Sequence, residues 1–244
     1  MIEALRAADG LHETDGGYRS AVRFASWRDL SFVHSSYPTE GADAVFFGPD
    51  TYRYLDFLDR VAGGASELGR VVDVGSGSGA GGLSLHGPGR SVVLTDINPL
   101  ALAFGEVNAD LNHLAGVESL HSDVLAAVDG PLAMVISNPP YMRDERARTY
   151  RDGGGDLGEA LAVRIVAEAA QRLRAGGRLI LYTGTAIVDG HDVFERAVRP
   201  MLSDAFDDVH YAELDPDVFG EQLDETGYRT VERIAAVGLQ ARRR

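Results

Sequence analysis

Residues 70–82 read RVVDVGSGSGAGG, and this stretch decides the fold. A short β-branched run ends in three glycines at alternate positions, Gly75, Gly77 and Gly79. Glycine allows a tight turn and lets a ligand approach the backbone without meeting a Cβ atom. The N–H groups at the start of the helix that follows attract an anion. The stretch therefore predicts a strand, a ligand-binding turn and a helix in an α/β sheet.

Beyond this turn, short β-branched segments alternate with helical segments rich in Ala and Leu. Seven strands are predicted, at Arg70–Val74, Ser91–Thr95, Val117–His121, Ala133–Ser137, Arg178–Thr183, Val209–Leu214 and Val231–Leu239. Helices are predicted at Pro99–Leu111, Leu157–Arg174 and Asp192–Leu202. The second of these helices is expected to end at a glycine C-cap, Gly176–Gly177.

This alternation indicates a parallel sheet with helices on both faces. The last two strands have no clear helix between them, so they predict an antiparallel edge. The predicted fold class is therefore α/β, with a doubly wound, mostly parallel seven-stranded sheet.

The first 66 residues differ in composition and contain the single Trp of the chain, Trp27, together with several other aromatic residues. Ser26–Leu30 and Thr51–Leu58 are predicted to be helical. A segment this short buries too little apolar surface to form a core of its own. We therefore expect a helical N-terminal extension over residues 1–66, which acts as a substrate lid, and a ligand-binding domain over residues 67–244.

The composition excludes several kinds of chemistry. The chain of 244 residues carries 37 acidic and 23 basic residues, a net charge of −14, and contains neither Cys nor Lys. Disulfides, thiolate nucleophiles and Schiff-base lysines are therefore excluded. The acidic balance argues against binding long nucleic acid through its phosphates, so nucleic acid is the less expected partner.

The remaining composition signals concern metals and membranes. The seven His residues show no metal-ligand spacing, so no metal site is expected. There is no apolar run of about 20 residues, and the first residues lack the apolar core of a signal peptide. We therefore expect no membrane partner and a cytoplasmic location.

Carboxylates follow the second and third predicted strands. Asp96 lies about twenty residues beyond the glycine turn, where a carboxylate accepts hydrogen bonds from both hydroxyls of a ribose. Asn98 is available to cap the helix that begins at Pro99, which leaves Asp96 for a ligand. Ile97 is placed to lie flat against an adenine ring. Asp123 is suited to an exocyclic amino group, although an Asp after a strand is more often a turn residue or a helix cap.

The fourth predicted strand ends in Asn138, Pro139, Pro140 and Tyr141. Two consecutive prolines fix φ, remove two N–H donors and keep Asn138 out of helical geometry. Such a rigid turn aims the side-chain oxygen of Asn138 and the carbonyl of Pro139 into the crevice as acceptors. Tyr141 adds a flat aromatic face. A plain strand-ending turn is the alternative, but it needs neither the Asn before the prolines nor the Tyr after them.

The chain resembles the class I S-adenosylmethionine-dependent methyltransferases with an NPPY motif, through Asp73–Gly79, Asp96, Asp123 and Asn138–Tyr141. That group includes the glutamine-N5 methyltransferases of peptide-chain release factors and several adenine- and guanine-N methyltransferases. Phe47–Tyr52 is similar to a segment that precedes the catalytic domain of the release-factor enzymes. The charged loop after Tyr141 departs from their pattern.

The resemblance implies S-adenosylmethionine as the cofactor, bound by Asp73, Gly75, Gly77, Gly79, Asp96, Ile97, Asp123, Val124 and Asn138. It also implies that Asn138, Pro139 and Tyr141 are catalytic. The implied reaction is methylation of a planar amide or amino nitrogen of a protein side chain or a small molecule, and methylation of an rRNA or DNA base is the alternative.

A second interpretation of the glycine turn belongs to another class of enzyme. Counted from Gly77, the turn fits the pattern G-x-G-x-x-G, which is also found in NAD(P)-dependent oxidoreductases. That class has no use for the run Asn138–Tyr141, and the sequence offers no evident proton donor for it.

Overall fold

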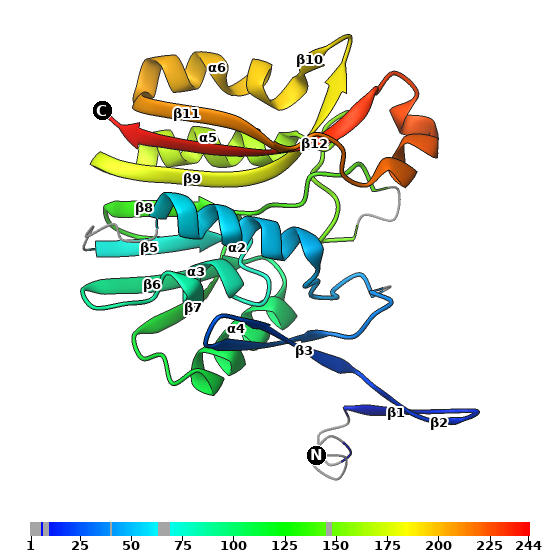
Figure 1. The fold of residues 1–244 in the computed structure, drawn as a ribbon. Helices are drawn as coiled ribbons and strands as arrows, with labels where there is room; N and C mark the ends of the chain where they lie inside the picture. The colour runs from blue at the N-terminus through cyan, green and yellow to red at the C-terminus, as the bar shows by residue number, and fades with distance from the viewer. Residues whose placement is uncertain (1–5, 7–9, 40, 63–68, 145–147) are drawn as a thin grey trace.

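The computed structural model describes residues 6, 10–39, 41–62, 69–144 and 148–244. Its centre is a sheet with the strand order β11-β12-β9-β8-β5-β6-β7 (Figure 1). These strands are β5 (Gly69–Val74), β6 (Arg90–Asp96), β7 (Val117–His121), β8 (Leu132–Ser137), β9 (Leu173–Val188), β11 (Phe206–Asp215) and β12 (Arg233–Arg243). A two-residue strand, β10 (His191–Asp192), pairs with β9 beside this order.

Pairing directions confirm the predicted topology. The neighbours from β7 to β9 are parallel. β12 pairs antiparallel with β9 over ten residue pairs, from Arg233 to Arg242, and β11 pairs antiparallel with β12 at the edge. The sheet is therefore doubly wound and mostly parallel, with the expected antiparallel end.

Helices cover both faces of the sheet (Figure 1). α2 (Pro49–Ala62), α3 (Ala80–Ser84) and α4 (Pro99–Leu111) pack on one face, and α5 (Ala160–Arg172) and α6 (Val193–Ala205) pack on the other. Two short 3-10 helices, η1 (Gly220–Asp224) and η2 (Thr226–Tyr228), precede β12. Among the described residues, no helix has the length and apolar character that crossing a membrane requires.

Local sequence explains where these elements begin. Every residue of β8 is buried, as expected for a central parallel strand that reads LAMVIS. The Asn98 side chain accepts a hydrogen bond from the Leu100 N–H at 3.0 Å, so Asn98 caps α4 as predicted, with Pro99 in the first turn. The Asp192 side chain caps α6 in the same way through the Glu195 N–H.

The N-terminal part differs from the prediction. It contains two antiparallel hairpins, formed by β1 (Leu11–Thr14) with β2 (Gly17–Ser20) and by β3 (Val22–Trp27) with β4 (Leu30–Ser35). The predicted helix over Ser26–Leu30 is wrong, because Trp27 and Leu30 pair across a turn in which Arg28 has a φ of 51°.

The second helix expected in this part is confirmed by α2, which is longer than predicted. A purely helical extension is therefore ruled out for the described part of residues 1–66. The predicted boundary at residues 66 and 67 lies outside the described residues, and the role of residues 1–66 as a lid stays a prediction.

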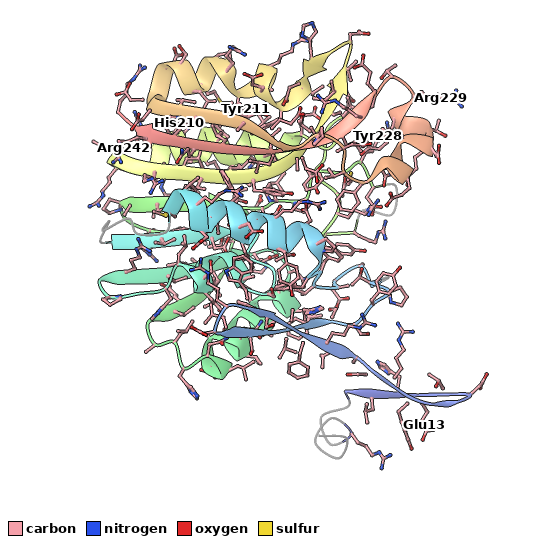
Figure 2. All side chains as sticks on the ribbon, in the orientation of Figure 1. Glu13, His210, Tyr211, Tyr228, Arg229 and Arg242 are labelled. Atoms are coloured by element: carbon pink, nitrogen blue, oxygen red, sulfur yellow. The ribbon has the colours of Figure 1, made fainter. Side chains whose placement is uncertain are left out.

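The two hairpins are placed differently. β1 and β2 project away from the body, and Figure 2 shows Glu13 out on this projection. β4 instead lies along α4, where Asn108 and Asn112 bond to its backbone: the Asn108 side chain pairs with Val33 and the Asn112 side chain with Ser31. Two amide side chains thus pair with the free edge of β4 as a neighbouring strand would.

Candidate functional site

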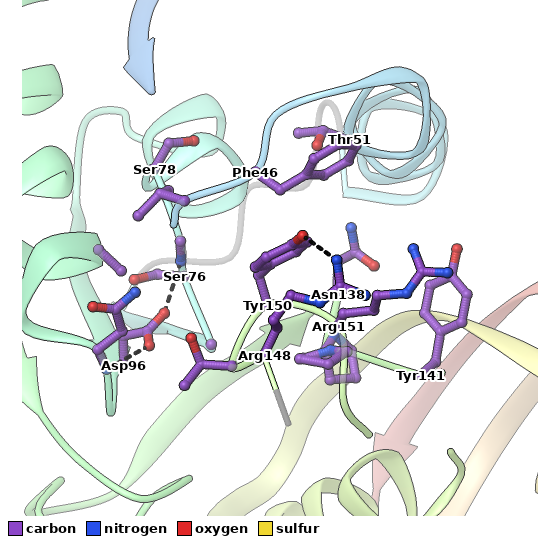
Figure 3. A pocket seen from close by; sticks show the side chains of 18 of the residues that line it. Phe46, Thr51, Ser76, Ser78, Asp96, Asn138, Tyr141, Arg148, Tyr150 and Arg151 are labelled. Carbon is purple, nitrogen blue, oxygen red and sulfur yellow. Dashed lines mark hydrogen bonds between the residues drawn. The ribbon is translucent and has the colours of Figure 1, made fainter. Parts of the chain in front are cut away.

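A cavity of about 560 Å³ lies at the carboxyl ends of β5, β6 and β8 (Figure 3). All four motifs that the sequence singles out reach it, from Asp73–Ser78, Asp96–Asn98, Ser122–Val124 and Asn138–Met142. The expectation that these strand ends line one crevice is therefore met. The rest of the lining comes from segments between residues 37 and 54, from residues 148–151 and from a few further positions.

The glycine turn leaves room for a ligand. Gly75 and Gly77 have φ of 65° and 54°, which favour glycine. A Cβ atom on Gly75 would meet nothing within 4 Å, and one on Gly77 would come no closer than 3.9 Å, to Val45. The buried hydroxyl of Ser76 makes no hydrogen bond. The turn therefore has open space beside its backbone and a polar group without a partner.

Gly79 has another role than the one predicted for it. It does not line the cavity, and a Cβ atom there would lie 3.0 Å from Leu94 and 3.2 Å from Leu83. Its φ is 78°, at the start of α3. Gly79 therefore allows α3 to pack closely on the sheet, and it lies outside the lining of the cavity.

Asp73 lies at the bottom of the turn and is almost completely buried. Its carboxylate accepts a hydrogen bond from the Gly82 N–H at 2.7 Å. Burial raises the pKa of Asp73 to about 7; the Gly82 hydrogen bond opposes this change, and the charge of Asp96 adds to it. An ammonium group in the cavity would hold Asp73 ionised, which fits the predicted contact with the amino acid part of the cofactor.

Asp96 and Ile97 both line the cavity, and their contacts with a ribose and a base stay predictions. The two carboxylate oxygens of Asp96 accept hydrogen bonds from Gly77 N–H at 3.0 Å and Asn98 N–H at 2.9 Å (Figure 3). Burial raises the pKa of Asp96, and these two hydrogen bonds lower it by part of that change. Each oxygen keeps a lone pair for a hydroxyl. Ile97 lines the cavity and is 51% exposed, so it offers apolar surface to a flat ring.

The Asp123 carboxylate is less available to a ligand than the sequence indicates. It lines the cavity, but its carboxylate forms an ion pair of 2.9 Å with Arg164 of α5. Val124, which is buried beside it, has a φ of 51°. The predicted contact of Asp123 with an amino group stays a prediction, and a ligand there would share the carboxylate with Arg164.

The run from Asn138 to Tyr141 is held rigidly at the end of β8. Ser137 donates its hydroxyl to the Val74 carbonyl at 2.7 Å, which ties this end to the glycine turn of β5. Tyr141 packs edge-on against Phe219 and is 7% exposed. A Cβ atom on Gly184 would lie 2.2 Å from the Tyr141 ring. The ring is therefore mostly enclosed by protein, and its stacking on an acceptor stays a prediction.

Two segments that are far apart in the sequence meet beside the cavity that both of them line. The Tyr150 hydroxyl donates to the Thr39 carbonyl at 2.6 Å, and the Tyr150 ring stacks on Phe46 with 6.1 Å between centroids. The Thr149 N–H donates to the Ala42 carbonyl at 3.3 Å. Arg148 donates to the Tyr150 hydroxyl and forms an ion pair with Asp144 (Figure 3). We call residues 39, 41–46 and 148–151 the roof.

Sequence reasoning does not predict the contacts that join the two segments of the roof. It offers Asp50 only as a cap of the helix over Thr51–Leu58, and misses it as a buried carboxylate that lines the cavity. No spacing rule singles out an Asp in the first turn of a helix, where it is commonly a stabilising residue.

The chain matches the methyltransferase small domain model over residues 57–211. It is 38% identical to the release factor glutamine methyltransferase of Deinococcus radiodurans, over 59% of this chain and 55% of that protein. It is 37% identical to the ribosomal RNA small subunit methyltransferase C of Chromohalobacter salexigens, over 46% of this chain and 30% of that protein. The chain thus spans about half, or less, of the length of these curated relatives.

Solved structures agree on the fold. The chain superposes on the Thermus thermophilus 16S rRNA N2 G1207 methyltransferase, solved with AdoMet and guanosine, with a TM-score of 0.60 and 21% identity, covering 96% of this chain and 57% of that one. It superposes on the Methanocaldococcus jannaschii tRNA m1G37 methyltransferase with a TM-score of 0.62 and 16% identity, covering 95% and 59%. The predicted doubly wound, mostly parallel α/β fold is confirmed as the Rossmann-like fold of methyltransferases. Because the family model covers more than half of the chain, this protein belongs to the methyltransferase small domain family of S-adenosylmethionine-dependent enzymes.

Proposed function

We propose that the protein methylates a planar amide nitrogen, with a protein side chain as the acceptor. The observation that carries this proposal is the meeting of the glycine turn and the run Asn138–Tyr141 in one cavity. A cofactor held at the first and an acceptor held at the second would be neighbours. Positioning of this kind is a large part of what enzymes contribute to group transfer.

The residues present fit S-adenosylmethionine. Gly75 and Gly77 leave space for its amino acid part, Asp73 offers a carboxylate for its ammonium, and Asp96 faces the place of its ribose. Ile97 offers an apolar surface for its adenine. When bound, S-adenosylmethionine supplies an electrophilic methyl group.

Asn138 and Pro139 prepare the acceptor. The nitrogen lone pair of a planar amide is delocalised, so that nitrogen is a poor nucleophile. Hydrogen bonds from its two N–H groups to the Asn138 side-chain oxygen and the Pro139 carbonyl would favour a more tetrahedral, electron-rich nitrogen. An oxygen acceptor would instead need a base to take its proton, and these two groups only accept hydrogen bonds. The Asn138 side-chain oxygen and the Pro139 carbonyl therefore favour a nitrogen atom as the methyl acceptor.

Two observations favour a protein acceptor. The net charge of −14 repels a phosphate backbone, and the match to a release factor glutamine methyltransferase covers 59% of this chain, against 46% for the rRNA small subunit methyltransferase C. An rRNA base is the second candidate. It is favoured by the roof, in which the stacked rings of Phe46 and Tyr150 lie beside Arg148, and by the rRNA methyltransferase relatives.

The test is transfer of a labelled methyl group from S-adenosylmethionine to two probes, a purified release factor and naked small-subunit rRNA. We expect label on a glutamine amide of the release factor, located by mass spectrometry. The variant Asn138→Ala should lower turnover about a hundredfold or more and leave cofactor affinity nearly unchanged. Label in rRNA alone would reject the protein acceptor, and label on an oxygen atom would reject amide methylation.

A further inference from the structure

A buried hydroxyl of α2 lies in the wall of the cavity, and neither the sequence motifs nor the proposed reaction uses it. Tyr54 lines the cavity and is 3% exposed. Its hydroxyl makes no hydrogen bond with any residue that the structure describes. Buried polar groups in native proteins are almost always paired, so an exception calls for an explanation. Because this hydroxyl belongs to the lining of a ligand cavity, it is available to a bound ligand.

The fold holds the Tyr54 ring in place. Asp50 and Tyr54 are four residues apart on one face of α2, and both line the cavity. The Tyr54 ring packs in one apolar cluster with Tyr182 of β9, with 6.1 Å between the ring centroids. It also lies against the backbone at Gly81, where a Cβ atom would come within 2.7 Å of the ring. A ring enclosed in this way has little freedom to turn its hydroxyl toward another partner.

The Tyr54 hydroxyl and the Asp73 carboxylate converge beside Gly81. A Cβ atom on Gly81 would lie 2.7 Å from the Tyr54 oxygen and 3.0 Å from Oδ2 of Asp73. Gly81 itself lines the cavity, so both oxygens belong to the same part of it. Any larger side chain at this position would push the two groups away. Glycine therefore allows a hydroxyl from α2 and a carboxylate from the end of β5 to approach one another.

The chemistry of these two oxygens favours a ligand group that donates hydrogen bonds. An ionised carboxylate only accepts, whereas a Tyr hydroxyl both donates and accepts. Burial, and after it the charge of Asp73, raises the pKa of Tyr54 well above its ordinary value, so the hydroxyl keeps its proton at neutral pH. An ammonium group can donate to both oxygens at once and balances the charge of Asp73. A ligand carboxylate at the same place would be repelled by Asp73.

We propose that the Tyr54 hydroxyl binds the ammonium group of S-adenosylmethionine together with Asp73, and so selects ligands that carry this ammonium. The inference deepens the proposed function and rests on it for the identity of the cofactor, but it is independent of the methyl acceptor. Tyr54 precedes residues 57–211, which the family model covers. Part of the cofactor site therefore comes from a residue before the matched region.

Calorimetry without any acceptor tests this contact with three ligands. S-adenosylhomocysteine keeps the whole amino acid, its decarboxylated analogue keeps only the ammonium, and its deaminated analogue keeps only the carboxylate. We expect Tyr54→Phe to weaken binding of the first two about 10-fold or more, as loss of a hydrogen bond to a charged group predicts, and to leave the third within about twofold. Unchanged affinity for S-adenosylhomocysteine, or a loss that follows the carboxylate, would overturn the inference.

Thermal unfolding separates ligand binding from a structural role. Tyr54→Phe removes a hydroxyl that has no partner among the described residues, so the melting temperature of the free protein should not fall. The stabilisation that S-adenosylhomocysteine gives at a fixed concentration should instead be smaller than in wild type. Tyr52→Phe is the matched control on the same helix, because the Tyr52 ring packs on Phe47 and lies outside the lining of the cavity. It should leave all three affinities unchanged.

The outcomes separate this contact from the proposed function. A lower melting temperature of free Tyr54→Phe, with an equal loss of affinity for all three ligands, would indicate a structural residue and overturn the inference. Wild type that binds the deaminated analogue as tightly as S-adenosylhomocysteine would overturn it as well, for Asp73 and Tyr54 together. If the effect of Tyr54→Phe follows the ammonium and yet the protein methylates no amide, the proposed acceptor fails and the Tyr54 contact stands.

Discussion

Asp73 gives the protein a pH dependence that can be measured without a substrate. Its pKa is about 7 in the folded protein because it is buried, against an ordinary value of 3.8. Between these two values the folded state binds a proton that the unfolded state does not, so the stabilising contribution of this group is complete below about pH 4 and disappears as the pH rises through 7. Tyr54 and Asp96 are the titratable groups that act on its pKa: the charge of Asp96 raises it and the nearby Tyr54 hydroxyl lowers it.

We therefore expect the free energy of unfolding to fall from pH 5 to pH 8 more steeply in wild type than in Asp73→Asn, which removes the titration. Urea denaturation at both values measures the difference. The variant keeps an oxygen for the Gly82 N–H, so the fold should be retained. Parallel pH profiles for the two proteins would show that Asp73 does not titrate in this range.

At the same scale, sequence reasoning found residues but not their partners. The spacing from the glycine turn placed Asp96 in the cavity, and the cap preference of Asn98 was correct. The ion pair of Asp123 with Arg164 joins residues 41 positions apart, so no local pattern reveals it. Gly79 has the same spacing as Gly75 and Gly77, yet it faces Leu94 rather than the cavity. The difference between Gly79 and the other two glycines comes from side-chain packing, which the spacing does not encode.

At the scale of elements, the hairpin of β3 and β4 is joined to the cofactor cavity through α4. The fully buried side chain of Asn108 donates to the carbonyls of Val33 and Ser78 at 3.0 and 2.8 Å and accepts from the Val33 N–H. Ser78 belongs to the glycine turn. From β4, Ser35 bonds to both backbone groups of Val45, which lies beside Gly77. One amide therefore links the hairpin and the turn.

Asn108→Ala should destabilise the protein by about 2–4 kcal/mol, because it leaves buried backbone groups without partners at about 1–3 kcal/mol each. We also expect calorimetry to show weaker binding of S-adenosylmethionine, because the glycine turn at Gly77 and Ser78 loses its hydrogen bond with Asn108. Asn112→Ala is the matched control, because it touches Ser31 but not the glycine turn, and should lower stability without changing affinity. If Asn108→Ala and Asn112→Ala bind S-adenosylmethionine equally well, the hairpin does not support the cofactor site.

The elements themselves were predictable where burial alone determines them. Continuous apolar runs identified the central strands, and the caps identified α4. The hairpin was missed because Ser26–Leu30 contains a turn that helical spacing hides, although Phe32 and His34 alternate inward as in a strand. The sequence predicts a helix end at Gly176–Gly177, but α5 ends at Arg172 and both glycines lie in β9. A Cβ atom on Gly177 would lie 3.1–3.2 Å from the carbonyls of Leu132 and Ala133, a contact between strands that only the fold creates.

At the scale of the whole molecule, the roof joins two segments more than a hundred residues apart over the proposed acceptor side of the cavity. The hydrogen bonds between its two segments run from the Tyr150 hydroxyl to the Thr39 carbonyl and from the Thr149 N–H and hydroxyl to the Ala42 carbonyl, and Tyr150 stacks on Phe46. Their sum is a few kcal/mol at most, well below the stability of a whole domain. The roof should therefore open locally while the sheet stays folded.

We expect the proposed protein acceptor to displace this roof when it brings a side chain to Asn138. We expect hydrogen exchange at the Thr149 amide to become faster in Tyr150→Phe by about 5- to 10-fold, the equivalent of one hydrogen bond of about 1 kcal/mol. Amides of β8 are the internal control and should not change. Binding of the release factor to wild type should expose the Thr149 amide in the same way, because the bond to Ala42 must break for a macromolecule to enter. Protection that persists in a productive complex would mean that the acceptor reaches Asn138 by another route.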